Sequence, residues 1–218
     1  PGEAAKDAAA VFSMVADDEA SSRCWLADDG ALTTSPRGAF AIECSTVSHG
    51  QALKLAAAAK AKGLTYLDCP VNGAPSAAAS GNLILLVGSA PADLDCAKPL
   101  LSLISSQILH FGPIGTGTAF KLINNLMGAV HIAGLAEGIA LARKLGLDPA
   151  VLQAAIESGP CASPHLKRLV PAMSKGEIST NPGLSIGLRE KDSRYCLALA
   201  KDADVALPVG REAHAWYA

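Results

Sequence analysis

The side chains best suited to chemistry in this chain gather in one short stretch. It carries two glycines, one lysine and two asparagines at fixed spacing, namely Gly115, Gly117, Lys121, Asn124 and Asn125. At helical spacing, Lys121 and Asn125 would stand one above the other on one face of a helix. A lysine amine that can lose and regain its proton near neutral pH serves as a general acid and base.

The surroundings of Lys121 decide whether it can act in this way. Pro113 and the two glycines interrupt regular structure, and an apolar run then continues without proline to Gly146. This pattern predicts a helix of about 25–30 residues, with Thr116 or Thr118 as its cap. The positive end of the helix dipole, together with partial burial, would favour the neutral amine. The plain alternative is a solvated surface lysine beside asparagines that bind loop backbone.

The bulk composition argues against several classes of protein. The 218 residues carry a formal net charge of −2 with no long run of one sign, which disfavours a nucleic-acid or membrane-surface partner. The longest apolar run is interrupted by glycine, polar and charged residues, so we expect no membrane span. Six widely spaced cysteines indicate buried free thiols in a reducing compartment, and the cytoplasm is the expected location. The five histidines show no ligand spacing, so we expect no metal site.

Short apolar strands alternate with helices in the first half of the chain. We expect strands at 11–15, 39–44, 64–69, 83–88 and 107–111, and helices at 18–28, 49–62 and 91–104 after the end of an alanine-rich helix at 3–10. This alternation predicts a mostly parallel sheet with helices on both faces. Farther along we expect helices at 117–146, 148–158, 163–175 and 188–204, with a loop at 176–187. The fold is therefore predicted as a partial Rossmann-like α/β domain at 1–115 and an all-helical domain at 116–218, built on a long connecting helix.

Ligands of such sheets collect at the carboxyl ends of the strands. Residues 45–48, 70–74 and 112–117 all fall at or just beyond such ends. The serines and threonine at 45–48 are also placed to cap the following helix and to bind an anion. The Gly-x-Gly-x-x-Gly turn that should follow the first strand of a nucleotide-binding fold is not in this sequence. We therefore expect the chain to be a fragment that lacks the first strand, turn and helix of the fold, and to bind dinucleotide poorly by itself.

Four segments, in this order and spacing, resemble the β-hydroxyacid dehydrogenase family. This family comprises 3-hydroxyisobutyrate dehydrogenases and their relatives, with 6-phosphogluconate dehydrogenase and imine reductases as cousins. Residues 68–74, Asp-Cys-Pro-Val-Asn-Gly-Ala, resemble the family's substrate loop, Asp-Ala-Pro-Val-Ser-Gly-Gly. Residues 115–125 are similar to its catalytic segment, Gly-x-Gly-x-x-x-Lys-x-x-Asn-Asn. Residues 45–48 match the strand end beside the nicotinamide, and Lys191–Asp192 matches the carboxy-terminal pair that closes the site.

The resemblance implies an NAD- or NADP-linked reaction on a small 3-hydroxy acid or its semialdehyde. It makes Lys121 the general acid/base and gives Asn125 the role of orienting the substrate and the lysine. The implied substrate-binding residues are Asn72, Gly73, Ala74 and Asn124, and the implied cofactor-binding residues are Met14, Val15, Ser45, Thr46, Lys191 and Asp192. Asn72 replaces the usual serine and Ala74 the second glycine, so the pocket should be reshaped and the identity of the substrate stays open.

Two other functions remain as alternatives. One is a catalytically silent relative that acts as a binding or assembly module, although inactive relatives typically lose the lysine retained at 121. The other is an imine or semialdehyde reductase, of which imine reduction is disfavoured because those relatives usually carry Asp or Tyr at that position. The helix expected at 117–146 is apolar on nearly every side and must be buried in its own domain or against a partner. We therefore expect a homodimer or homotetramer joined through the helical domain.

Overall fold

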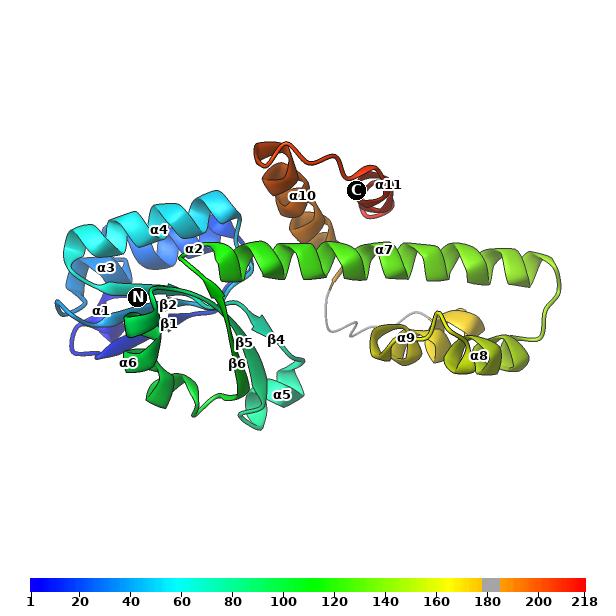
Figure 1. Cartoon of the computed structure of the whole chain (residues 1–218), viewed down its shortest axis with the longest axis horizontal. Coiled ribbons are helices and arrows are strands. Elements are labelled where there is room, and N and C mark those ends of the chain that lie inside the picture. The colour runs from blue at the N-terminus through cyan, green and yellow to red at the C-terminus, as the bar shows by residue number, and fades with distance from the viewer. Residues whose placement is uncertain (178–184) are drawn as a thin grey trace. The chain divides into compact units, whose positions relative to one another are not determined.

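The computed structural model describes residues 1–177 and 185–218 and divides into two compact units (Figure 1). The first unit holds Pro1–Asn124 together with Arg194–Val205, and the second holds Asn125–Ser193 together with Ala206–Ala218. The division therefore falls inside the long helix, whereas the boundary expected near residue 115 lies at the start of that helix. Most of the loop expected at 176–187 lies outside the described residues.

The first unit is built on a six-stranded sheet in which parallel pairing dominates. Its strands are β1 (Ala10–Ser13), β2 (Phe40–Glu43), β3 (Thr65–Asp68), β4 (Val71–Asn72), β5 (Leu83–Gly88) and β6 (Ser105–Gly112). β1, β2 and β3 run parallel, as do β5 and β6, whereas β5 meets both β3 and β4 antiparallel. The mostly parallel sheet and its five expected strands are confirmed. The additional strand β4 is too short to show a periodic pattern in the sequence.

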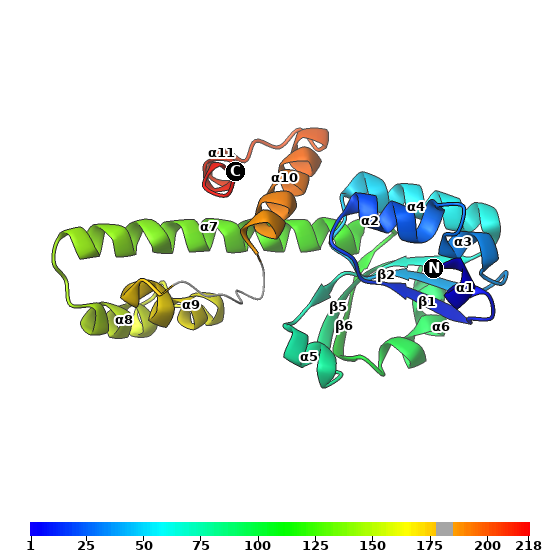
Figure 2. The same cartoon turned by 180° about the vertical axis from the view of Figure 1, so that it is seen from behind.

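Helices cover both faces of this sheet (Figures 1 and 2). They are α1 (Gly2–Ala5), α2 (Asp18–Leu26), α3 (Ala31–Thr34), α4 (His49–Lys62), α5 (Pro75–Ala79) and α6 (Pro91–Leu101). Alternate residues of a strand face opposite sides, which explains the two cores. Ala41 and Tyr66 pack with Trp25 of α2 and other residues of α1–α4. Their neighbours Ile42 and Leu67 pack with residues of α6 instead.

The second unit is helical, as expected. It contains most of α7 (Thr116–Lys144), all of α8 (Pro149–Ser158), α9 (Pro164–Lys175) and α11 (Pro208–Ala215), and the first part of α10 (Ile186–Asp202). Its core joins Leu135 and Ile139 of α7 to Leu166 and Val170 of α9. The short helices α3, α5 and α11 were not expected from the sequence, since each offers too few turns for an apolar face to repeat.

The helix α7 is long and apolar enough to cross a membrane by length and composition alone. It has 29 residues, and its most apolar window has a mean hydropathy of 1.3 and is 39% buried. No apolar run was expected to make a convincing membrane span, but α7 meets the criteria of length and composition. One helix of this kind is weak evidence for a membrane protein, because the core helix of a soluble protein passes the same test.

The six cysteines are all free thiols. Cys44, Cys69 and Cys196 are buried, but Cys96 and Cys161 are exposed, so the expectation that the cysteines are buried is wrong for these two. Cys44 and Cys69 follow the paired strands β2 and β3. A hydrogen bond with Cys69 and burial together raise the pKa of Cys44, which leaves this thiol as a protonated packing group.

Candidate active site

Lys121 lies in the second turn of the helix α7, and its side chain contacts the strand β4 (Val71–Asn72). Its Nζ donates to the backbone oxygen of Val71 at 2.7 Å and to Oδ1 of Asn72 at 2.9 Å. The lysine side chain is half-buried, and both of these acceptors are uncharged. The structure thus brings together two sequence-predicted residues, the candidate acid/base Lys121 and the candidate substrate-binding Asn72.

The next two residues of the substrate loop, Gly73 and Ala74, are exposed. Gly73 has a φ of 148°, and a Cβ at this position would lie 2.8 Å from Cδ2 of Leu83. The backbone conformation therefore favours glycine here, and the side chain of Leu83 would have to shift to admit a Cβ. Ala74 precedes α5 as its N-cap residue, so the loop bends away immediately after the contact with Lys121.

Asp68, the last residue of β3, determines where α7 begins. Its fully buried carboxylate accepts hydrogen bonds from the backbone N–H groups of Gly115 at 2.9 Å and Thr118 at 2.7 Å. A carboxylate at this helix end is favoured by the helix dipole. Burial raises the pKa of Asp68, and the two backbone N–H groups act in the opposite direction. Asp68 therefore supplies the cap that the sequence analysis assigned to a threonine.

Close packing of two glycines lets α7 start beside the sheet. A Cβ on Gly117 would lie 2.2 Å from the backbone oxygen of Leu86, and one on Gly88 would lie 2.2 Å from Oδ1 of Asp68. Asp68 was expected only as part of the substrate loop. Its role in positioning the start of α7 was not expected from the sequence. The available signal was a carboxylate at the end of an otherwise buried strand.

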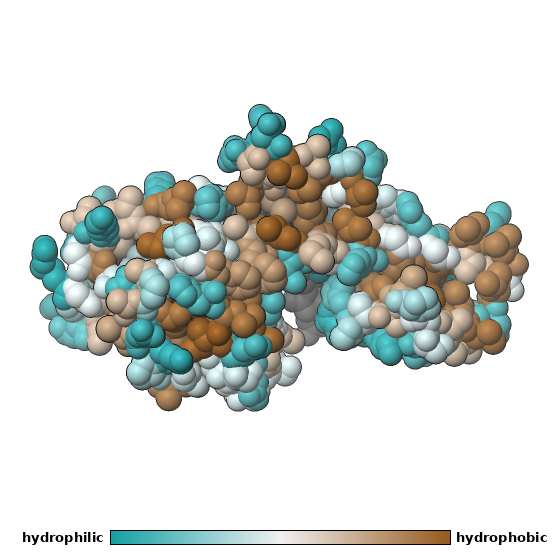
Figure 3. Space-filling model, viewed as in Figure 1, coloured by the Kyte–Doolittle hydropathy of each residue, from teal (hydrophilic) through white to brown (hydrophobic). Residues whose placement is uncertain are grey.

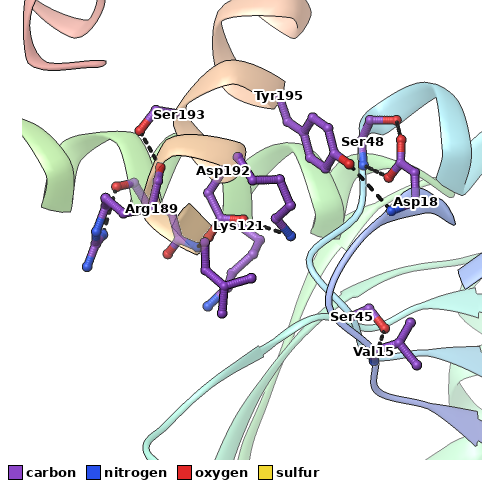
Figure 4. A network of polar contacts seen from close by, with 12 residues as sticks. Val15, Asp18, Ser45, Ser48, Lys121, Arg189, Asp192, Ser193 and Tyr195 are labelled. Atoms are coloured by element: carbon purple, nitrogen blue, oxygen red, sulfur yellow. Dashed lines mark hydrogen bonds and ion pairs between the residues drawn. The ribbon is translucent and has the colours of Figure 1, made fainter. Parts of the chain in front are cut away.

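The carboxyl ends of β1 and β2 bring four of the expected cofactor-binding residues together. The backbone N–H of Val15 donates to Oγ of the buried Ser45 at 2.7 Å (Figure 4). Met14 is 58% exposed, and Thr46 is half-buried. These strand ends therefore present an apolar, accessible surface beside a hydroxyl-bearing turn.

A buried glutamate that the sequence analysis did not single out supports this turn. Glu43 accepts a hydrogen bond from the backbone N–H of Ser45 at 2.9 Å. Its other carboxylate oxygen accepts from the hydroxyl of Ser21 at 2.6 Å and from Nε1 of Trp25 at 2.8 Å. The carboxylate thus holds the turn after β2 against α2. A glutamate inside an apolar strand was the signal in the sequence.

Side chains of the protein cap the amino-terminal end of α4. Oγ of Ser48 accepts from the backbone N–H of Gln51 at 3.2 Å, which confirms the expected serine cap. The carboxylate of Asp18 accepts hydrogen bonds from the backbone N–H of Ser48 at 2.7 Å and from the Ser48 hydroxyl at 2.6 Å (Figure 4). The backbone N–H of Asp18 donates to the hydroxyl of Tyr195 at 3.4 Å. From the sequence we expected an anion bound at this helix end. In the structure the negative group there is the carboxylate of Asp18.

The second unit holds Asn125, Lys191 and Asp192 in one buried cluster. Nδ2 of Asn125 donates to Oδ2 of Asp192 at 2.7 Å, which fixes the orientation of the amide. Nζ of Lys191 lies 3.1 Å from Oδ1 of Asp192, and both side chains are buried. Nη1 of Arg189 donates to the backbone oxygen of Asn125 at 3.2 Å. The expected pair Lys191–Asp192 is thus a buried ion pair that orients Asn125.

Asn124 and Asn125 follow Lys121 on the same continuous helix, Asn125 one turn later. Asn124 is half-buried. The described residues contain no group of three or more His, Cys, Asp or Glu side chains placed to hold a metal ion. The residues that fit a nicotinamide cofactor are those at the ends of β1 and β2, because an exposed apolar side chain there can cover a flat ring.

A Rossmann-like sheet with a half-buried lysine at its strand ends, followed along the chain by a helical unit, defines the class of two-domain nicotinamide-linked dehydrogenases. Two family models match the chain. Residues 1–112 match the NAD binding domain of 6-phosphogluconate dehydrogenase, and residues 115–218 match the NAD-binding domain of NADP-dependent 3-hydroxyisobutyrate dehydrogenase.

Individual relatives agree with these models. The chain is 35% identical over 205 residues to 3-hydroxyisobutyrate dehydrogenase of Pseudomonas aeruginosa, covering 92% of this chain and 69% of that protein. It is 33% identical over 181 residues to 2-(hydroxymethyl)glutarate dehydrogenase of Eubacterium barkeri, covering 83% and 60%. The crystal structure of 3-hydroxyisobutyrate dehydrogenase from Salmonella typhimurium superposes with a TM-score of 0.89 at 25% identity, covering 99% of this chain and 74% of that one.

The chain belongs to the β-hydroxyacid dehydrogenase family of NAD(P)-dependent oxidoreductases. Its cofactor is NAD or NADP, and its substrate is a small molecule. The two protein relatives are matched over 69% and 60% of their own length.

Proposed function

We propose that this protein interconverts a small 3-hydroxy acid and its semialdehyde with NAD or NADP, and that Lys121 is the general acid/base. The observation that carries the proposal is the position of Nζ of Lys121, 2.7 Å from the backbone oxygen of Val71 and 2.9 Å from Oδ1 of Asn72. The amine is thereby held against the loop that is similar to the family's substrate loop. Neither of these two acceptors adds a negative charge that would favour the ammonium form.

The names of the relatives support the substrate class. They include dehydrogenases of 3-hydroxyisobutyrate, 2-(hydroxymethyl)glutarate and L-serine. All three substrates carry a hydroxymethyl group on the carbon next to a carboxylate. We assign the carboxylate to Asn72, Gly73 and Ala74, whose backbone N–H groups and amide side chain can donate to it. The amide of Asn72 in place of serine would favour a compact substrate.

Each of the proposed site residues has a separate role in the reaction. NAD or NADP, when bound, would supply the hydride chemistry. In oxidation the neutral amine of Lys121 takes the proton of the substrate hydroxyl, and in reduction its ammonium returns a proton to the carbonyl oxygen. The ammonium also stabilises the negative charge that develops on that oxygen. Asn124 and Asn125 bind and orient the substrate, with Asn125 held by Asp192, while Met14, Val15, Ser45, Thr46 and Lys191 contact the cofactor.

The test is the absorbance of reduced nicotinamide when the purified protein is mixed with NAD or NADP and each of the three hydroxy acids. We expect turnover with at least one acid, and Lys121→Ala should abolish it while circular dichroism shows an intact fold. Lys144→Ala is the matched control, because Lys144 is an exposed lysine at the other end of the same helix. A near-normal rate for Lys121→Ala would refute the role of the lysine. Dinucleotide binding without turnover of any acid would favour the catalytically silent alternative.

We also propose that the protein is a cytoplasmic homodimer or homotetramer joined through its helical unit. Many apolar side chains of this unit are exposed, among them Met127, Leu141, Leu145, Leu147, Val151, Ile186, Val209 and Trp216. Figure 3 shows such residues gathered where α7 leads into α8. Exposed apolar surface of this extent favours a partner. Sedimentation that shows a monomer at micromolar concentration would contradict the proposal.

A further inference from the structure

The helical unit contains a cavity that the proposed function does not use. Its volume is about 180 Å³, and its apolar walls include Ile132 of α7 and Leu169 and Met173 of α9. An apolar protein cavity of about 150 Å³ is large enough to bind benzene. The cavity therefore has room for a ligand with a body about the size of a single ring.

The ionisable groups that line this cavity are basic or neutral. They are His165, Arg168, Arg189 and Tyr217, and no carboxylate of residues 1–177 or 185–218 lines the cavity. Arg189 is only 8% exposed, and in the described part of the chain it forms no ion pair. Asp192, the acidic group that acts on it, is already engaged by Lys191 and Asn125. Arg189 is therefore a buried cation whose charge lacks a dedicated counter-ion, which is unusual because buried charges are normally paired.

His165 supplies a second polar group without a partner. Its Nε2 is buried and makes no hydrogen bond within the described residues, whereas buried polar atoms are normally hydrogen-bonded. Burial, followed by the charges of Arg189, Arg168 and His131, lowers the pKa of His165. The hydroxyl of Tyr217, by contrast, already donates to the backbone oxygen of Ala129 at 2.9 Å. In the cavity, Nε2 of His165 therefore lacks a hydrogen-bond partner and Arg189 lacks an ion-pair partner within the described residues. The exposed Arg168 also lines the cavity.

We propose that this cavity binds a small organic anion, with an apolar body of single-ring size and one carboxylate. The carboxylate contacts Arg189 and Arg168 and accepts a hydrogen bond from Nε2 of His165, while the body packs on Ile132, Leu169 and Met173. None of these residues belongs to the Lys121 site. The site therefore goes beyond the dehydrogenase reaction, although Arg189 also contacts the backbone of Asn125.

Benzoate is the probe that matches this description. We expect isothermal titration of the purified protein to show benzoate binding at least about tenfold more tightly than benzyl alcohol, because only benzoate can form charge-assisted hydrogen bonds with the arginines. Inorganic phosphate, which lacks the apolar body, should bind more weakly than benzoate. Equal affinity for benzoate and benzyl alcohol would overturn the proposal. The measurement needs no turnover, so its result is independent of the dehydrogenase assay.

Two variants on the same helix locate the binding. Arg168→Gln should weaken benzoate binding about tenfold, whereas Lys167→Gln removes the same charge from a neighbouring residue outside the cavity and should change it less than about twofold. Arg168 is exposed, so its replacement should not unfold the protein. Asn72→Ala should leave benzoate binding unchanged. Equal effects of the two α9 variants, or loss of binding in Asn72→Ala, would refute the site and point to bulk charge or to the substrate loop.

Discussion

Two lysines of this chain make different polar contacts. Lys121, in the sheet-containing unit, is half-buried, and Nζ donates to a backbone oxygen and to the amide oxygen of Asn72. Lys191, in the helical unit, is buried with Nζ 3.1 Å from the carboxylate of Asp192. The contacts of Lys121 thus include two uncharged acceptors, whereas those of Lys191 include a charge of opposite sign.

The difference suggests different uses. Uncharged acceptors position an amine but do little to hold its proton, which suits proton transfer. In a buried ion pair the loss of either partner leaves an uncompensated charge in a poorly solvated place, so such a pair suits structure. We infer that Lys121 serves the proton transfer, whereas Lys191, besides its proposed contact with the cofactor, maintains the arrangement of Asp192 and Asn125. Four predictions test this division.

The largest effect on folding is expected for Lys191→Met. Removing the ammonium leaves the buried carboxylate of Asp192 without its counter-ion, so the free energy of unfolding should fall by about 3–5 kcal/mol. Urea denaturation measures the loss. Lys201→Met, at an exposed position of the same helix, should stay within about 0.5 kcal/mol of the parent. The double variant Lys191→Met/Asp192→Asn should recover part of the loss, and a single variant as stable as the parent would remove the distinction between the lysines.

A smaller loss is expected for Asp68→Ala, which acts on the surroundings of Lys121. The backbone N–H groups of Gly115 and Thr118 would lose their acceptor, which should cost about 2–4 kcal/mol of unfolding free energy. Because these groups set the start of α7, the rate of turnover should fall as well. Denaturation and steady-state kinetics on one preparation measure both effects. A variant with lower stability but unchanged turnover would show that Asp68 does not position Lys121.

Asn72→Asp would place a carboxylate beside Lys121, as Asp192 lies beside Lys191. A carboxylate beside the amine stabilises its ammonium form, so the pKa of Lys121 in this variant should rise by about one unit, equivalent to about 1.4 kcal/mol. Oxidation needs the neutral amine, and the acidic limb of its pH–rate profile should therefore move to higher pH. Asn72→Ser introduces the neutral residue usual in the family's loop and should leave that limb in place. Identical profiles for the Asp and Ser variants would contradict the assignment of Lys121 as the base.

The smallest expected effect is that of His165 on the stability of the protein at mildly acidic pH. Burial and the charges of Arg189, Arg168 and His131 lower the pKa of His165 below its usual value of 6.5. The unfolded chain therefore binds a proton at His165 before the folded chain does, and stability is lost as the pH falls from about 6.5 to the lowered native pKa. His165→Gln should lose less stability than the parent between pH 7.5 and pH 5 in thermal unfolding, by under about 1 kcal/mol. Equal losses would show that His165 does not contribute.

Local pattern was enough to locate most of the elements. The helix expected at 49–62 is α4 (His49–Lys62), and the long helix expected at 117–146 is α7 (Thr116–Lys144). Apolar runs of strand or helix length, ended by glycine or proline, leave few alternatives. The elements that were missed, such as β4 and α5, are two and five residues long. Their conformation depends on the neighbours they pair with and pack against.

Lys121, Asn125 and the loop at 72–74 could be chosen from residue type and spacing, because chemistry requires particular groups in a particular order. Which atoms meet could not be read in this way. The contact of Lys121 with Val71, the cap that Asp68 provides for α7 and the cavity around Arg189 each join residues far apart in the chain. The sequence by itself determined the family, the order of the elements and the candidate acid/base. Only the tertiary structure decided which lysine meets uncharged acceptors and which is buried against a carboxylate, because desolvation and pairing depend on what packs around a side chain.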